Sequence, residues 1–184
     1  MIYVISDTHF GHRKLDEYRK PNFETGILKR WNKTVNPSDT VIHCGDFILG
    51  RHQRRSFTGS LRFWRKQLNG KIILIRGNHD SKSCLWYMNN GFDFCADKVE
   101  MIVQGKRVVF THRPIKVAKD ELNIHGHVHS YKREVEAEAE IDAKKGYHFN
   151  ATIEHMGYTP KLLNSIVSEH HLYSPERGGR GGVQ

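Results

Sequence analysis

The chain has 184 residues, of which 29 are Lys or Arg and 20 are Asp or Glu, so its formal net charge is +9. This length suits one domain with a substantial core, and 38% hydrophobic and 27% charged residues are typical of a soluble globular protein. No apolar stretch approaches the roughly 20 residues that span a bilayer, while the charge favours anionic partners or reflects only a solvated basic surface.

The first half of the chain predicts strands that alternate with helices. Runs of β-branched residues indicate the strands, and apolar residues at helical spacing indicate the helices, in which Trp31 and Trp64 are expected to face the core. This alternation predicts βαβ units. In chain order the elements are strand 2–6, helix 25–35, strand 41–45, helix 56–68, strand 71–76 and helix 83–90.

The second half predicts further strands. Segments 99–103 and 107–110 read as a hairpin joined by Gln104-Gly105-Lys106. Segments 122–125 and 147–153 are further strand candidates. We therefore expect an α/β sandwich of two sheets with flanking helices.

One domain is expected over residues 1–175, followed by a Gly/Arg-rich tail over 176–184 that is predicted to be flexible. The acidic, Ala-rich segment 134–145 reads either as a solvated helix or as a mobile loop. The N-terminal apolar run has no basic segment before it and is interpreted as a strand, not a signal peptide. Three cysteines, Cys44, Cys84 and Cys95, have no metal-like spacing and are expected to be reduced thiols in a cytoplasmic protein.

Five short clusters of Asp, Asn and His follow the predicted strands. Strand ends are where α/β folds place their chemistry, and carboxylate, amide and imidazole groups bind divalent metals of intermediate hardness. Any one cluster alone fits ordinary turn chemistry equally well, but five in succession do not. They are Asp7-Thr8-His9, Gly45-Asp46, Gly77-Asn78-His79-Asp80, Thr111-His112 and Gly126-His127-Val128-His129.

The order of these clusters resembles the signature of the calcineurin-like metallophosphoesterase superfamily. The match spans residues 7–129, and within it Gly-Asn-His-Asp and Gly-His-x-His are the most specific pieces. The stretch 30–47 is also similar to a group of small bacterial and phage phosphoesterases. The resemblance implies a four-layer α/β/β/α sandwich of two mixed β-sheets flanked by helices, and a metal-dependent phosphoesterase.

The resemblance also implies two divalent metal ions, with Mn²⁺ expected first and Fe, Zn²⁺ or Ni²⁺ as alternatives. A hydroxide bridging the two ions would attack the phosphorus of a phosphodiester. Asp46 would be shared between the two ions, and His79 would protonate the leaving oxygen, oriented by Asp80. The first ion would be held by Asp7, His9, Asp46 and His129, and the second by Asp46, Asn78, His112 and His127.

Other polar residues near the clusters show weaker evidence of a functional role. His12 is a candidate for contact with substrate, and Arg113 either binds a phosphate oxygen or forms a surface salt bridge. His43 reads as a core or cleft side chain, and His125 as strand-end structure. Asn150 is expected to hydrogen-bond the His-x-His loop.

The sequence alone leaves several functions open. The expected partner is a small or nucleotide-like phosphate ester, with nucleic acid also a candidate and no membrane partner; the oligomeric state is not readable. A phosphomonoesterase or phosphoprotein phosphatase, or a nuclease acting on nucleic-acid ends, are the enzymatic alternatives. An interaction scaffold or a nucleic-acid-binding module are the non-enzymatic ones, and the presence of His79 favours an enzyme over a scaffold.

Overall fold

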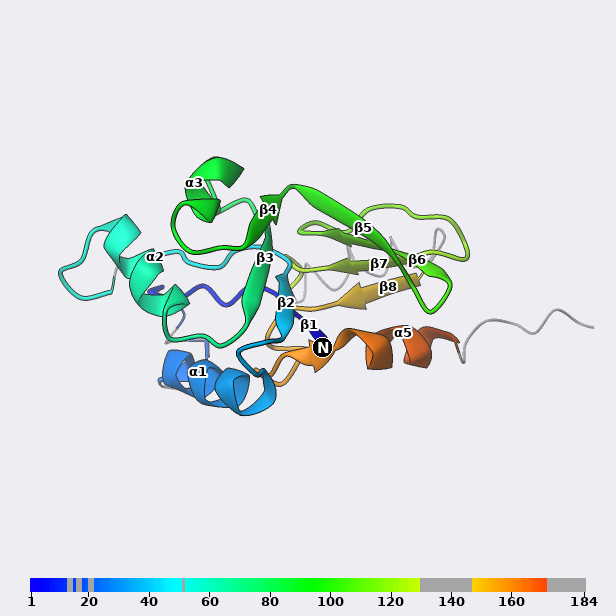
Figure 1. Ribbon diagram of the computed structural model, residues 1–184, viewed down its shortest axis with the longest axis horizontal. Helices are drawn as coiled ribbons and strands as arrows, with labels where there is room; N and C mark the ends of the chain where they lie inside the picture. Colours follow the sequence, from blue (N-terminus) through cyan, green and yellow to red (C-terminus); the bar gives the residue numbers. More distant parts are fainter. Residues whose placement is uncertain (13–14, 16–17, 20–21, 51, 130–146, 172–184) are drawn as a thin grey trace, which may run out of the picture.

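Two β-sheets build the computed structural model of the protein, which describes residues 1–12, 15, 18–19, 22–50, 52–129 and 147–171 (Figure 1). The first sheet has the order β4-β3-β2-β1-β9, and its strands are parallel except for β9. The strands are β1 (Ile2–Ile5), β2 (Thr40–His43), β3 (Lys71–Ile75), β4 (Phe94–Ala96) and β9 (Lys161–Leu162).

The second sheet is also mixed, with the order β5-β6-β7-β8. β5 and β6 form the predicted antiparallel hairpin, whereas β6, β7 and β8 run parallel. An isolated parallel bridge between Ser6 and Thr152 links the end of β1 to the segment after β8. The strands are β5 (Lys98–Val103), β6 (Lys106–Thr111), β7 (Leu122–His125) and β8 (Tyr147–Asn150).

Three helices cover the face of the first sheet that points away from the second sheet (Figure 1). They are α1 (Phe23–Thr34), α2 (Phe57–Arg65) and α3 (Cys84–Met88). Trp31 of α1 and Trp64 of α2 are both buried in this core, as predicted, together with Tyr87 of α3. Ser56 caps α2, because its side chain accepts a hydrogen bond from the amide of Gly59.

A second core lies between the two sheets. Val4 and Ile42 of the first sheet pack with Phe110 and Ile124 of the second. The last helix, α5 (Leu163–His171), inserts Ile166 and its neighbours into the same core. The residues of β6 and β7 in this core, Val108, Phe110, Leu122 and Ile124, have the two-residue spacing of one strand face.

The predicted fold class is confirmed: the chain forms two mixed sheets of five and four strands flanked by helices. Each predicted strand and helix is present, strand 122–125 with the predicted bounds and the others with bounds that differ by at most three residues. β4, β9 and α5 were not predicted. The acidic segment 134–145 and the tail 176–184 lie outside the described residues. None of the described helices is long and apolar enough to cross a membrane.

Candidate metal centre

The ligand-type side chains are carried by turns that follow β1, β2, β3, β6 and β7. Four of these residues have left-handed backbone conformations that are rare for residues other than glycine: Asp7, His9, Asp46 and His127 have φ values of 57°, 46°, 53° and 69°. Such conformations persist only where surrounding contacts enforce them, and they concentrate at functional sites. Here the amides of Asp7 and His9 donate to the carbonyls of Gly45 and Asp46, so the first two turns hold each other.

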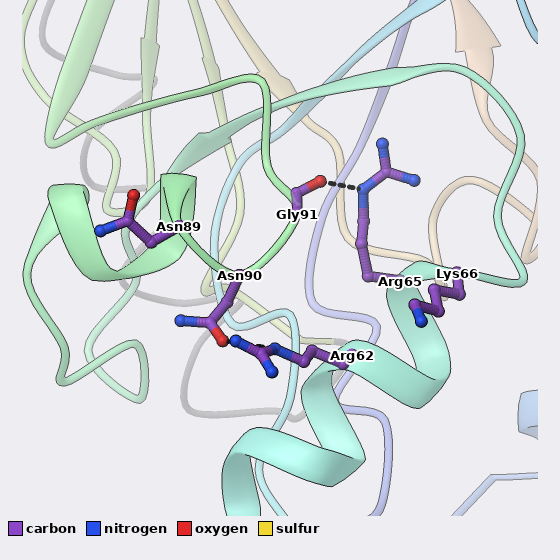
Figure 2. A pocket seen from close by; sticks show the side chains of 6 residues that line it. All are labelled: Arg62, Arg65, Lys66, Asn89, Asn90 and Gly91. Atoms are coloured by element: carbon purple, nitrogen blue, oxygen red, sulfur yellow. Dashed lines mark hydrogen bonds between the residues drawn. The ribbon is translucent and has the colours of Figure 1, made fainter.

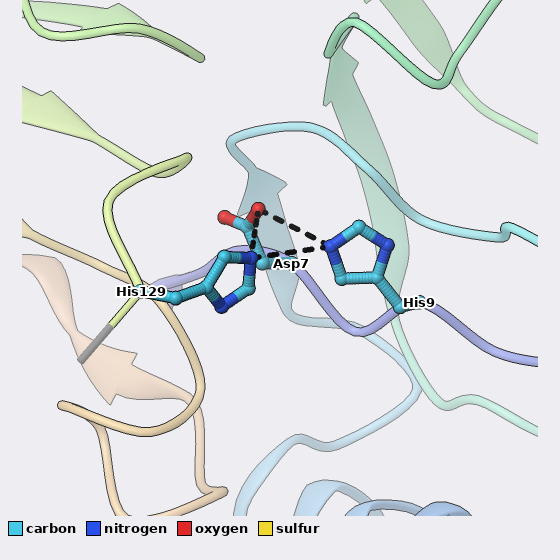
Figure 3. Close-up of side chains that lie close together, drawn as sticks. All are labelled: Asp7, His9 and His129. Carbon is cyan, nitrogen blue, oxygen red and sulfur yellow. Dashed lines mark hydrogen bonds and ion pairs between the residues drawn. The ribbon is translucent and has the colours of Figure 1, made fainter. Parts of the chain in front are cut away.

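Asp7, His9 and His129 converge on one point (Figure 3). The Nε2 atoms of His9 and His129 lie 3.6 Å and 3.4 Å from Asp7 Oδ1, and 3.3 Å from each other. The other carboxylate oxygen of Asp7 accepts hydrogen bonds from the Ser6 hydroxyl at 2.5 Å and from the amide of His127 at 3.0 Å. These bonds fix the carboxylate and leave Oδ1 directed at the two imidazoles.

His112 lies between oxygen acceptors on both sides. Its Nδ1 is 2.9 Å from the carbonyl oxygen of Cys44, and its Nε2 is 2.9 Å from Asn78 Oδ1. When Nδ1–H donates to that carbonyl, the Nε2 lone pair faces Asn78 Oδ1 and also Asp46 Oδ2, which is 3.6 Å away. Three lone-pair atoms then point at one place, an arrangement that a cation satisfies.

Asp46 stands between the two groups of side chains. Its Oδ2 is 3.7 Å from His9 Nε2 and 3.6 Å from His112 Nε2, while its Oδ1 accepts from the amide of His79 at 2.9 Å. This is the position that a bridging carboxylate needs. The Asp7 carboxylate is shared as well, because it belongs to a group with His9 and His129 and to another with Asp46 and His112, in each of which the ligand atoms lie within 4.8 Å of one another.

The buried carboxylate of Asp7 tests whether a metal fits. Its Oδ1 is buried and has no hydrogen-bond partner among the residues that the structure describes. Burial alone would raise the pKa of Asp7, but the imidazoles of His129 and His9 outweigh burial and hold the pKa well below its usual value. A buried, ionised oxygen within 3.6 Å of two imidazole nitrogens is complementary to a divalent cation that replaces the imidazole proton.

His127 and His79 lie at the rim of this arrangement. The His127 ring packs against the ring of His112 with centroids 5.0 Å apart, and burial, followed by the charges of His112 and Arg113, lowers its pKa to about 4, so the imidazole is neutral and able to act as a ligand. His79 is 42% exposed, and its Nε2 is 3.9 Å from Asp46 Oδ2. An exposed imidazole next to the shared carboxylate can reach a group that enters from solvent.

Asp80 is placed differently from the expected orienting role. Its carboxylate turns inward and accepts from the amides of Asp46 at 2.7 Å and Gly77 at 2.8 Å. Among the described residues it makes no hydrogen bond with the imidazole of His79, which lies beside Asp46 and the ring of His9. Burial raises the pKa of Asp80 to about 6. Asp80 therefore ties the turn after β3 to the turn after β2.

Two charged residues that the sequence did not single out support the centre. Glu154 Oε2 lies 3.2 Å from His129 Nδ1, and Glu154 also forms an ion pair with Arg19, whose NH2 is 2.7 Å from Oε1. Arg19 is 5% exposed and donates further to the carbonyls of Thr8 at 3.1 Å and Asp7 at 2.9 Å. Glu154 follows a buried strand-like segment, so the strand-end pattern that selected the other clusters also applies to it.

Of the remaining candidate residues, His12 and Arg113 lie next to ligand residues, whereas His43 and His125 are buried in the core. The ring of His12 lies 6.1 Å from that of His9, and Arg113 is exposed directly after His112. His43 is buried and bonds the Thr8 hydroxyl at 3.0 Å, and burial lowers its pKa to about 3. His125 is buried as well. The side chain of Asn150 donates to the carbonyl of Val128 at 2.6 Å and so holds the His-x-His loop as expected.

Comparison with known proteins agrees with this geometry. The model of the calcineurin-like phosphoesterase family matches residues 1–182. An uncharacterized protein of Methanocaldococcus jannaschii is 30% identical over 176 residues, which is 90% of this chain and 89% of the relative.

Among solved structures, the chain is similar to a protein of unknown function from Aquifex aeolicus. It is 29% identical, covers 92% of this chain and 98% of its own, and superposes with a TM-score of 0.72. An archaeal phosphodiesterase is 25% identical over 70% of this chain and 73% of its own, with a TM-score of 0.44. The family match over nearly the whole chain, with the Asp and His side chains converging as such an enzyme needs, shows that the chain belongs to the calcineurin-like phosphoesterase family.

Proposed function

We propose that the protein hydrolyses phosphodiesters, with two divalent metal ions, Mn²⁺ first among them, held by Asp7, His9, Asp46, His112 and their neighbours. The convergence of buried Asp and His atoms within 4.8 Å supports this proposal. Bound there, the ions would supply an acidified water as nucleophile and neutralise charge on the phosphate.

The side chains of the chain itself would do three things. Asp46 would hold the two halves of the centre together from its position between His9 and His112. The exposed imidazole of His79 would give a proton to the leaving oxygen, because its Nε2 lies 3.9 Å from the shared carboxylate of Asp46. His12 and Arg113, on the turns that continue from His9 and His112, would contact the substrate phosphate.

Hydrolysis assays with a matched histidine control test this function. Protein loaded with Mn²⁺ would be given bis-p-nitrophenyl phosphate and p-nitrophenyl phosphate in parallel. Replacing His79 by Ala should lower kcat for the diester by about 10²- to 10⁴-fold, the usual contribution of a general acid. His155→Ala removes an exposed imidazole elsewhere and should change nothing. No hydrolysis with any metal, or an undiminished His79→Ala variant, would refute the proposal, and faster turnover of the monoester would reassign the protein as a phosphomonoesterase.

A further inference from the structure

The positive charge of the chain is concentrated in one stretch. Residues 47–79 contain eight Lys and Arg residues and neither Asp nor Glu. The whole chain has a net charge of +9, so the rest of it is close to neutral. This stretch begins directly after Asp46 and carries the loop that precedes α2, α2 itself and β3.

Part of this charge is neutralised and part is free for an outside partner. Arg65 and Arg76 form ion pairs with Asp93 and Asp97. Arg55, Arg62 and Lys66 are exposed, and within the described part of the chain no carboxylate lies within ion-pair distance of any of the three. Arg62 and Lys66 are four residues apart at the end of α2 and therefore share one side of it, about 6 Å apart along its axis. We call Arg55, Arg62 and Lys66 the α2 cationic face.

A pocket of about 280 Å³ opens beside this face, between α2 and the segment after α3 (Figure 2). Its lining carries no acidic residue. Arg65 forms part of the pocket wall, and its guanidinium is held there because it donates to the carbonyls of Gly91, Leu68 and Gly70. Arg62 Nε donates to Asn90 Oδ1 at 2.8 Å, and this is its only side-chain hydrogen bond within the described residues. Its outer nitrogens and the ammonium of Lys66 remain to bind an anion.

Arg55 of the α2 cationic face is linked to the metal centre through packed residues. The segment after Asp46 runs beside the turn that carries His9, since the amide of Leu49 donates to the carbonyl of Phe10 and Gly50 contacts Gly11 so closely that a Cβ would lie 1.8 Å from its oxygen. Beyond that point the His52 ring stacks on Phe63 with centroids 4.2 Å apart, and the guanidinium of Arg55 lies 4.7 Å from the same ring.

We propose that the α2 cationic face binds the phosphate backbone of a nucleic acid whose scissile phosphodiester lies at the metal centre. The inference rests on the proposed function, which supplies the phosphodiester chemistry. Three exposed cations without a carboxylate partner among the described residues suit a partner that carries one phosphate per nucleotide. Arg62 and Lys66 are not among the grouped ligand residues of the centre, so the face would favour a substrate long enough to contact both places.

Binding measurements with two triple variants test the proposal. The probe is a labelled single-stranded phosphorothioate oligonucleotide of about 12 nucleotides, within the site size of known single-strand-binding grooves. Fluorescence anisotropy would compare the wild type with Arg55→Gln/Arg62→Gln/Lys66→Gln. The matched control, Lys29→Gln/Lys33→Gln/Lys119→Gln, removes three exposed cations elsewhere. Loss of three phosphate contacts should weaken binding about tenfold and flatten the slope of log K against log[salt] by about 2.

Hydrolysis separates this proposal from the proposed function. The α2 variant should cleave bis-p-nitrophenyl phosphate as fast as the wild type and raise KM for an unmodified oligonucleotide. Equal binding by the wild type and the α2 variant, or equal losses in the two triple variants, would overturn the proposal, as would competition by polyaspartate that matches unlabelled DNA. If bis-p-nitrophenyl phosphate is not cleaved at all, the proposed function fails, while the binding result still decides whether the face holds nucleic acid.

Discussion

Glu154 determines which nitrogen of His129 is available to a metal. Its carboxylate faces Nδ1 at 3.2 Å, so Nδ1 carries a proton and Nε2 is directed at Asp7. Carboxylates in this position orient a ligating imidazole and make it more basic. The Arg19 guanidinium holds Glu154 in turn, and it also holds the carbonyls of the Asp7 turn.

Replacing Glu154 should therefore weaken metal binding without touching a ligand. For Glu154→Gln we expect Mn²⁺ affinity to fall about 10- to 100-fold, as with other supporting partners of metal ligands. Glu154→Ala should in addition destabilise the fold by about 3–5 kcal/mol, because it leaves the buried charge of Arg19 uncompensated. Isothermal titration and urea unfolding measure the two effects. Glu121→Gln, at a peripheral ion pair with Arg107, is the control; equal Mn²⁺ affinities in the two Gln variants would count against the role of Glu154.

The protonation of His129 predicts a pH dependence of metal binding. Burial lowers its pKa, but the adjacent carboxylates of Asp7 and Glu154 outweigh burial and raise the pKa to about 10 in the metal-free protein. The imidazolium must lose a proton before Nε2 can bind a metal, so affinity should rise with pH by about tenfold per unit below that pKa. Titrations of Mn²⁺ in two buffers with different ionisation enthalpies would count the released protons at pH 7. Release of no proton would contradict this picture.

At the scale of elements, the turn after β7 approaches the turn after β1 closely enough to require glycine. A Cβ on Gly126 would lie 2.0 Å from Ser6 Oγ and 2.3 Å from Asp7 Oδ2. Gly126→Ala should displace the Asp7 carboxylate, cost about 1–3 kcal/mol of stability through overpacking, and abolish high-affinity Mn²⁺ binding. Titration calorimetry beside thermal unfolding checks both effects.

Gly105→Ala is the control for this substitution. A Cβ on Gly105 would meet nothing within 4 Å, but its φ of +76° makes alanine strained, at a cost of about 1 kcal/mol. The control should therefore lose some stability and keep its metal affinity. Intact Mn²⁺ binding in Gly126→Ala would mean that the Asp7 turn tolerates the displacement.

The sequence alone predicted those residues of the metal centre that directly follow an apolar strand. Asp7, Asp46 and His112 each follow an apolar run, so local pattern was enough to mark them. Arg19 carries no such mark, because its role comes from Glu154, which is 135 residues away in the chain. β9 has only two residues and exists through its pairing with β1, for which no local periodicity is available.

The inward turn of Asp80 escaped prediction for a related reason. Its neighbour in sequence, His79, suggested a pair, but the buried amides of Asp46 and Gly77 need an acceptor more than the exposed imidazole does. Spacing along the chain identified the polar residues of this turn, whereas backbone amides of the turn itself and of the turn after β2 decided where the Asp80 carboxylate points.

For the molecule as a whole, the metal centre joins the two sheets. Asp7 and Asp46 follow strands of the five-stranded sheet, whereas His112 and His129 follow strands of the four-stranded sheet. A ligand that binds only the folded chain stabilises it by mass action. Mn²⁺ at about 100 times its Kd should add about 2.7 kcal/mol per site to the free energy of unfolding. For a chain of this length, about 2–4 °C of Tm per kcal/mol gives a rise of roughly 5–10 °C.

Asp7→Asn tests whether this stabilisation comes from an ion bound at the metal centre. The amide keeps the shape of the side chain but removes the charge shared by both groups of ligand atoms, so the rise of Tm with Mn²⁺ should disappear. Calorimetric scans of both proteins, with Mn²⁺ and after chelation, measure it. A wild type indifferent to Mn²⁺ would show that the two sheets are held by their apolar core alone. The same rise in Asp7→Asn would place the stabilising ion elsewhere on the molecule.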